Sequence, residues 1–243
     1  MITLAVDTSE SRGSVALLLG GAREGEGVGE SVGVEVHHAP VDYSEWLLPA
    51  AERVLAGASV QMEELDLLAV ATGPGSFTGV RVGLATVKAW AEVYGKPVVG
   101  VSRLEAMARS LPLTVETGFV AVCYDAQRSQ LFAALYRNVA GSLTLVESEQ
   151  VIPAETFLNW ANDRAGAQSV AWVSLDPDLI TALPTWQKRV ACGDTMQRCA
   201  AQLAVSIGRL AEERARTGLF TDPLELDANY VRRSDAEIFW KGR

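Results

Sequence analysis

Glycine, proline and hydroxyl residues are concentrated in one short segment, Gly73-Pro74-Gly75-Ser76-Phe77-Thr78-Gly79. It lies between an apolar run at 65–72 and a helix-like stretch at 80–94, which predicts a strand-to-helix loop. Glycines let the backbone adopt positive φ and approach a neighbour closely, a hydroxyl can cap the helix, and free N–H groups at a helix start suit an anion. The residues of interest in this loop are Gly73, Gly75, Ser76, Thr78 and Gly79.

The phosphate chemistry that this loop suggests is not that of a Walker loop, which requires a glycine, any four residues and then Gly-Lys-Ser/Thr. Counted from Gly73, the second glycine position is Thr78, and Val80 follows Gly79 where a lysine would stand. The Walker interpretation is therefore rejected. Two interpretations stay open, namely a helix N-terminus that binds a phosphate and glycines that only allow close packing.

Histidine and cysteine chemistry is scarce in this chain. His37 and His38 are the only histidines, so no HxxxH or HExxH pair exists. Adjacent side chains in an extended segment point to opposite sides, which disfavours chelation by these two. The three cysteines show no CxxC spacing, and Cys123, inside an apolar run, is expected to be a buried reduced thiol. We therefore expect no metal site and no catalytic residue.

Composition and charge exclude several classes of function. The chain is 49% hydrophobic and 21% charged, as expected for a globular protein. Its formal net charge of −9 would repel a nucleic-acid backbone, so the chain is not expected to bind tRNA by itself. No apolar run reaches the length of about 18 residues that spans a bilayer, and the N-terminus lacks the basic start of a signal peptide. We expect no membrane association and a cytoplasmic location.

Strands and helices alternate in the first half of the chain. Residues 2–6 and 14–19 predict a hairpin whose first strand leads to Asp7. Ser44 is expected to cap a first helix, and a second helix after the glycine loop places Gly83 on a face of small residues that permits close packing. A strand at 97–102 and a helix at 104–111 follow. This order predicts a mixed sheet covered by helices.

The second half repeats the opening layout. Residues 119–124 and 131–136 predict another hairpin, with Asp125 in the place of Asp7. The repeat predicts a duplicated α/β fold with a boundary near residue 110, that is, domains 1–110 and 111–243. Further elements are predicted by periodicity and by helix start and stop signals. They are helices at 153–165 and 194–216 and strands at 169–174 and 189–191.

The hairpins that end in aspartate are similar to those of the actin-like ATPase (ASKHA) superfamily, in which the two aspartates face a nucleotide and its Mg²⁺. Four segments together closely resemble the bacterial TsaB (YeaZ) family. They are Asp7-Thr8-Ser9, Ser44 to Pro49, Gly73 to Gly83, and Val99 to Ala106. The resemblance is strong over residues 1–110, weak through the second hairpin, and returns at residues 230–237. It implies an actin-like fold of two mixed-sheet domains, the second reduced.

Membership of that family implies a non-catalytic subunit of the machinery that makes N6-threonylcarbamoyladenosine next to the anticodon of ANN-decoding tRNAs. The catalytic paralogue TsaD carries the metal-holding HxxxH pair, and the ATPase TsaE binds the pair of subunits. The resemblance implies no tightly bound cofactor here, with ATP or ADP and Mg²⁺ held through the complex, and tRNA bound only through the complex. The alternative is a small-molecule kinase that uses Asp7 and Asp125, although both aspartates could equally be turn formers.

The family places the contact with TsaD on the first two helices of the N-terminal domain, and the same surface can form a homodimer. The residues that this implies for partner binding are Leu47, Leu48, Ala51, Gly83, Val87, Ala89 and Trp90. On this interpretation Gly83→Trp would abolish association and leave the fold mostly intact. The alternative, that several of these side chains face their own sheet, stays open. Tyr43 stands where the family usually has a histidine.

Overall fold

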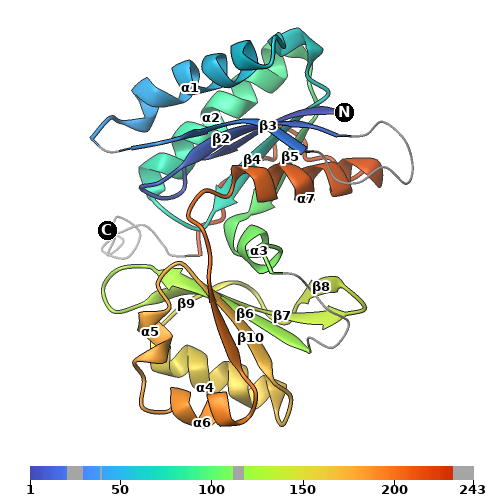
Figure 1. Cartoon of the computed structure of the whole chain (residues 1–243). Coiled ribbons are helices and arrows are strands. Elements are labelled where there is room, and N and C mark those ends of the chain that lie inside the picture. The colour runs from blue at the N-terminus through green and yellow to red at the C-terminus, as the bar shows by residue number, and fades with distance from the viewer. Residues whose placement is uncertain (21–29, 39, 112–117, 232–243) are drawn as a thin grey trace, which may run out of the picture. The chain divides into compact units, whose positions relative to one another are not determined.

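The computed structural model of the chain describes residues 1–20, 30–38, 40–111 and 118–231 (Figure 1). The chain divides into two compact units: Met1–Ala106 joins Ala201–Asn229 in the first, and the second runs from Met107 to Ala200. The predicted boundary near residue 110 is close to the first of these divisions. The predicted domain 111–243 differs from the second unit, because residues 201–229 return to the first. Most of the motif at 230–237 lies outside the described residues.

The first unit is built on a mixed sheet. Its strands are β1 (Ile2–Asp7), β2 (Ser14–Leu19), β3 (Glu30–Val36), β4 (Leu67–Gly73) and β5 (Val98–Ser102). They lie in the order β3-β2-β1-β4-β5. Strand β1 pairs antiparallel with β2, as the predicted hairpin requires, and parallel with β4. The prediction of a mixed sheet is confirmed.

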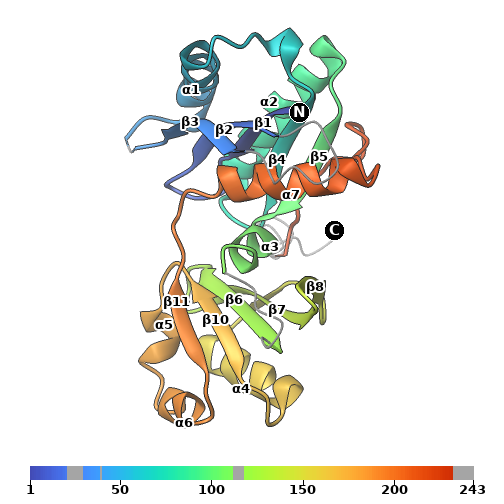
Figure 2. The ribbon, with the colours of Figure 1, turned by 45° about the vertical axis from the view of Figure 1, so that its right-hand side comes forward.

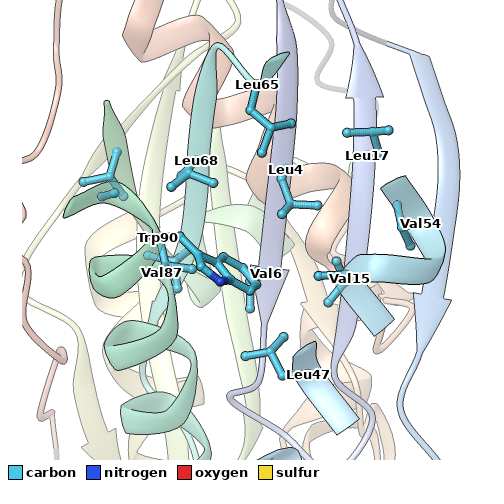
Figure 3. Close-up of a cluster of buried hydrophobic side chains, with 14 of the residues drawn as sticks. Leu4, Val6, Val15, Leu17, Leu47, Val54, Leu65, Leu68, Val87 and Trp90 are labelled. Atoms are coloured by element: carbon cyan, nitrogen blue, oxygen red, sulfur yellow. The ribbon is translucent and has the colours of Figure 1, made fainter. Parts of the chain in front are cut away.

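Helices cover both faces of this sheet. Helices α1 (Tyr43–Gly57) and α2 (Phe77–Tyr94) pack on one face, and α7 (Ala204–Arg216) packs on the other (Figures 1 and 2). A one-turn 3₁₀ helix, Met62–Glu64, precedes β4, and a short helix, α3 (Arg103–Ala108), follows β5. Apolar side chains of β1, β2, α1 and α2 form the core between sheet and helices (Figure 3). The residue at the N-cap of α1 is Asp42, so the prediction that Ser44 caps this helix is wrong.

Helix α7 joins the first unit because its apolar side fits the free face of that sheet. Ile207 and Leu210 are buried there. Gly208 is needed at this contact, since a Cβ at Gly208 would lie 2.6 Å from a methyl carbon of Leu18. The Thr3 hydroxyl also donates a hydrogen bond to the buried Glu212 carboxylate at 2.9 Å. These contacts join residues about two hundred positions apart, which local sequence patterns do not report.

The second unit repeats the sheet of the first. Its strands are β6 (Phe119–Asp125), β7 (Leu131–Val139), β8 (Ser142–Leu145), β9 (Gln150–Ile152), β10 (Val170–Ser174) and β11 (Thr195–Arg198). The order β8-β7-β6-β10-β11 matches β3-β2-β1-β4-β5, and β9 adds a short pairing with β7. Its helices are α4 (Ala154–Ala165), α5 (Asp178–Thr181) and α6 (Trp186–Ala191). The predicted duplication is therefore confirmed.

Two predictions for the second half are wrong. Residues 189–191 end the helix α6 and form no strand. The long helix predicted at 194–216 begins only at Ala204, because Thr195–Arg198 pairs parallel with β10. The Asp194 carboxylate fixes this strand start by accepting hydrogen bonds from the Val170 N–H and the Trp172 indole N–H. Met196 therefore lies in a strand, although the spacing of residues 194–216 predicts one long helix.

Candidate functional site

The glycine loop lies where the sequence predicts it, between the end of β4 and the start of α2. Gly73 has a φ of 99°, in the left-handed region of backbone conformation that residues with a Cβ rarely adopt. Ser76 is the N-cap of α2, and its Oγ accepts a hydrogen bond from the Gly79 N–H at 3.3 Å. Thr78 is exposed. Of the two hydroxyl residues in the loop, Ser76 and Thr78, Ser76 is therefore the one that caps the helix.

The other glycines serve a close approach between this loop and the turn after β1. A Cβ at Gly75 would overlap the Ser9 carbonyl oxygen, and a Cβ at Gly79 would overlap the Thr8 carbonyl oxygen. Two hydrogen bonds hold the two segments together, from the Ser76 N–H to the Ser9 oxygen and from the Thr8 hydroxyl to the Gly79 oxygen, both at 2.7 Å. The packing interpretation of the glycines thus has direct support, since the chain's own backbone fills the space beside them.

Asp7 ends β1 with its side chain fully buried, and it is paired with the equally buried Arg103 at the start of α3. The Arg103 Nε donates to one carboxylate oxygen of Asp7 at 3.2 Å, and the Ser9 N–H donates to the other at 2.9 Å. The Arg103 Nη2 donates to the Ala201 carbonyl at 3.0 Å. Arg103 was not predicted as a site residue, since nothing in its neighbourhood indicates a partner that lies 96 residues away.

Asp125 occupies the corresponding position at the end of β6 in the second unit. Its carboxylate accepts hydrogen bonds from the Gln127 backbone N–H at 2.7 Å and from the Gln127 side-chain amide at 3.0 Å. The bond to the residue two positions on is the same Asx turn that Asp7 makes with Ser9. Both aspartates are therefore turn formers, which is one of the two roles that the sequence left open for them.

Most of the residues expected to bind a partner are inside the core of the first unit. Figure 3 shows Leu47, Val87 and Trp90 among the buried side chains on the sheet. The full set of buried residues is Leu47, Ala51, Gly83, Val87 and Trp90. These side chains pack against their own sheet, which is the alternative that the sequence left open. Gly83→Trp is now expected to disturb the fold itself, since even a Cβ there would overlap the Thr8 hydroxyl oxygen.

The surfaces of α1 and α2 that point away from the sheet carry a different set of residues, which we call the outer helix face. Its members are Leu48, Glu52 and Ala56 on α1 and Phe77, Arg81, Ala85, Ala89 and Val93 on α2. Leu48 is 51% exposed and Val93 is 73% exposed, although both are large and apolar. The Arg81 guanidinium carbon lies 3.4 Å from the centre of the Phe77 ring. Leu48 and Ala89 are the two predicted contact residues that belong to this face.

Tyr43 connects the first turn of α1 to the β1–β2 turn. Its hydroxyl donates to the Glu10 carbonyl and accepts the Gly13 N–H at 2.7 Å. Burial raises the pKa of Tyr43 to about 12. The rings of His37 and Tyr43 lie 4.2 Å apart, and the His37 nitrogens face the carbonyl oxygens of Ser11 and Val41. These contacts position the two segments rather than offer a reactive group.

Neither a metal centre nor a membrane span is found in the part of the chain that the structure describes. No group of three or more His, Cys, Asp or Glu side chains within residues 1–20, 30–38, 40–111 and 118–231 could hold a metal ion. Over the same ranges, no helix combines the length and the apolar character that crossing a bilayer requires. The features that remain are the internally bonded turn at Asp7 and the outer helix face.

Comparisons with known proteins connect this chain to a tRNA modification. Residues 30–238 match the family model described as "TsaD: tRNA N6-adenosine threonylcarbamoyltransferase". A Bacillus subtilis protein named "tRNA threonylcarbamoyladenosine biosynthesis protein TsaB" is 31% identical over 158 residues, which make up 65% of this chain and 62% of that protein. A Haemophilus influenzae protein of the same name is 31% identical over 180 residues, or 70% of this chain and 72% of that protein.

A solved structure from Pseudomonas aeruginosa, described as an uncharacterized protein with similarity to peptidase YEAZ, has the same fold. It superposes with a TM-score of 0.72 at 25% identity and covers 95% of this chain and 99% of that one. The chain spans 62% of the length of the Bacillus subtilis relative, which is less than two thirds. The predicted fold class, a duplicated actin-like fold with two mixed sheets, is confirmed.

Proposed function

Because this chain belongs to the TsaB (YeaZ) family, we propose that it is a non-catalytic subunit required for forming the threonylcarbamoyl group on N6 of the adenosine next to the anticodon in ANN-decoding tRNAs. The observation that carries the proposal is the match of residues 30–238 together with the Haemophilus influenzae relative. In this role the chain binds and activates a TsaD-like catalytic subunit. A TsaE-like ATPase joins the two subunits, and tRNA is bound only through the complex.

A supporting role fits the residues of this chain better than a catalytic one. Its two histidines, His37 and His38, are adjacent and cannot form an HxxxH pair. Asp7, which a kinase of this fold would use, is already engaged by Arg103 and the Ser9 N–H. The alternative of a small-molecule kinase or ATPase therefore has no support at this aspartate. We propose that ATP or ADP with Mg²⁺ is held through the complex rather than tightly by this chain.

The surface we propose for the partner is the outer helix face. Exposed leucine, phenylalanine and valine side chains on helices that already pack on their own sheet indicate a surface that a partner covers. Ala85 and Ala89 lie one turn apart on α2 and carry no side chain beyond Cβ, so a helix of another protein can approach closely. We propose the same face for a homodimer, which would then compete with the heterodimer.

The net charge of −9 supports indirect rather than direct binding of tRNA. A phosphate backbone would be attracted to the basic surface of another subunit and repelled by this one. Because tRNA is modified inside the cell and the chain shows no apolar run long enough to span a bilayer, we propose a cytoplasmic location. Neither proposal requires a residue of this chain to touch the modified base.

The experiment that tests the proposed surface is co-elution with the TsaD-type subunit encoded in the same genome. Ala89→Arg adds a long charged side chain to the outer helix face and should weaken association by at least about tenfold, as expected for a charge forced into an apolar contact. Ala191→Arg is the matched control, since Ala191 is an exposed helical alanine of the second unit. Equal association of both variants would contradict the proposed face, and no association of the wild-type chain would contradict the proposed subunit role.

A further inference from the structure

The charge pair in the turn after β1 is unusual in its burial. Asp7 and Arg103 are both 0% exposed, and the pair is joined at 3.2 Å. Removing two charges from water is costly, and such a pair persists only where geometry and further hydrogen bonds compensate for the lost hydration. Here the second carboxylate oxygen accepts the Ser9 N–H, and Arg103 also donates to the Ala201 carbonyl. The pair therefore connects three separate segments of the first unit.

The fold class implies a nucleotide and a divalent cation at this turn, and the residues present do not fit them. A divalent cation at Asp7 would have to share the carboxylate with a guanidinium that already balances its charge, and two cations at one buried carboxylate repel each other. Near this turn, the described residues provide no group of three His, Cys, Asp or Glu side chains for a metal. The charge that a metal would supply is supplied by Arg103.

A phosphate does not fit beside the turn either. The glycine loop is in van der Waals contact with the backbone of Thr8 and Ser9, so that even a Cβ at Gly75 or Gly79 would overlap a carbonyl oxygen. The Ser76 N–H is bonded to the Ser9 oxygen, and the Gly79 N–H is bonded to the Ser76 hydroxyl. Anion sites at helix starts depend on N–H groups that point to open space. These two are already bonded within the chain.

Two buried polar atoms at the turn make no hydrogen bond within the described ranges. They are the Ser9 hydroxyl oxygen and the Nη1 of Arg103, whose Nε and Nη2 are bonded. However, Ser9 is 0% exposed, and its carbonyl and Cβ are packed against Gly75. A ligand arriving from solvent would have to open the contact between the glycine loop and the turn before it could reach the Ser9 hydroxyl. The unpaired hydroxyl therefore gives no entry to a nucleotide.

We infer that Arg103 is a built-in counter-cation, which replaces a divalent metal at Asp7 and makes the turn a permanent structural joint that takes no metal-bound nucleotide. The joint fixes the end of β1, the start of α3 and the segment that leads into α7 without any ligand. The first unit keeps its structure whether nucleotide is present or not. This inference does not depend on the proposed function, since it concerns the interior of this chain alone.

Two measurements on the full-length chain test it. The first is equilibrium dialysis of the wild-type chain against millimolar Mg·ATP, for which we expect no saturable uptake and no change in Tm. The second is a double-mutant cycle with Asp7→Asn and Arg103→Met. Arg103→Met alone leaves a buried carboxylate without its cation and should lower Tm by about 10 °C. The double variant should regain about half of that loss, because the amide oxygen that Asp7→Asn introduces can still accept the Ser9 N–H.

A buried pair in the second unit provides the matched control. Arg189 and Asp194 are joined at 2.8 Å, and Asp194 keeps its hydrogen bonds from Val170 and Trp172 if the arginine is removed. Arg189→Met should lower Tm, and Asp7→Asn should not restore it. The inference is overturned if the wild-type chain takes up Mg·ATP saturably and Asp7→Asn abolishes the uptake, or if the effects of Asp7→Asn and Arg103→Met simply add. The dialysis of the wild-type chain tests the inference even if a variant fails to fold.

Discussion

A single methyl group at Gly79 tests whether the glycine loop exists for packing. In Gly79→Ala the new Cβ would overlap the Thr8 carbonyl oxygen and disturb the 2.7 Å hydrogen bond from the Thr8 hydroxyl to the residue 79 oxygen. Overpacking costs about 1–3 kcal/mol, and a weakened hydrogen bond costs about 1 kcal/mol. The better helix propensity of alanine returns about 1 kcal/mol. The net loss is about 2 kcal/mol, or about 4–8 °C in Tm for a chain of this size.

The matched control is Gly57→Ala. Gly57 is the last residue of α1, and no atom lies within 4 Å of the Cβ that it would gain. Helix propensity alone then predicts a gain of about 0.5–1 kcal/mol. Thermal unfolding followed by near-ultraviolet circular dichroism should show Gly79→Ala below and Gly57→Ala above the wild type. If Gly79→Ala has the same Tm as the wild type, the glycine at this position is not required for packing. The interpretation of the loop as an anion-binding helix start would then be favoured again.

Two further predictions concern titrating side chains. Iodoacetamide at about pH 8 should modify the exposed Cys192 first, because burial raises the pKa of Cys123 to about 12 and Cys199 is also buried. Mass spectrometry measures the rate of modification at each cysteine. Modification of Cys123 as fast as that of Cys192 would contradict the burial of Cys123. Because the pKa of Tyr43 is raised in the fold from 10.0 to about 12, the contribution of Tyr43 to stability should be constant below pH 10. It should be lost between pH 10 and 12, as the phenol ionises first in the unfolded chain. Tyr43→Phe should be less stable than the wild type at neutral pH, and its stability should not show the decline that Tyr43 causes between pH 10 and 12. The urea midpoint of unfolding, measured as a function of pH, tests this. An equal fall of the midpoint in both proteins would show that Tyr43 does not cause the decline.

Features encoded by neighbouring residues could be predicted from the sequence. The hairpin of β1 and β2 and the glycine loop with its Ser76 cap follow from alternation, turn residues and capping chemistry within a few positions of each other. The duplication was visible because Asp125 repeats the position of Asp7 in a similar frame. Each of these signals is local, and each is confirmed by the structure.

Features that depend on distant residues could not be predicted. The burial of Leu47 and Val87 depends on which side of each helix meets the sheet, and an apolar stripe does not say whether it faces its own sheet or a partner. The pair of Asp7 and Arg103 joins strand and helix ends that only the folded sheet brings together. The start of α7 at Ala204 depends on the pairing of β11 with β10, which competes with local helical periodicity.

In the proposed role, this chain is needed for a reaction that it does not catalyse. The most direct measurement is the rate of threonylcarbamoyl transfer to an ANN-decoding tRNA in a purified system, with and without this chain and with every other component fixed. We expect the rate to depend on the chain and to fall with Ala89→Arg. With Asp7→Asn the rate should be retained in proportion to the fraction of the variant that is folded. A rate that is the same with and without the chain would contradict the proposed role.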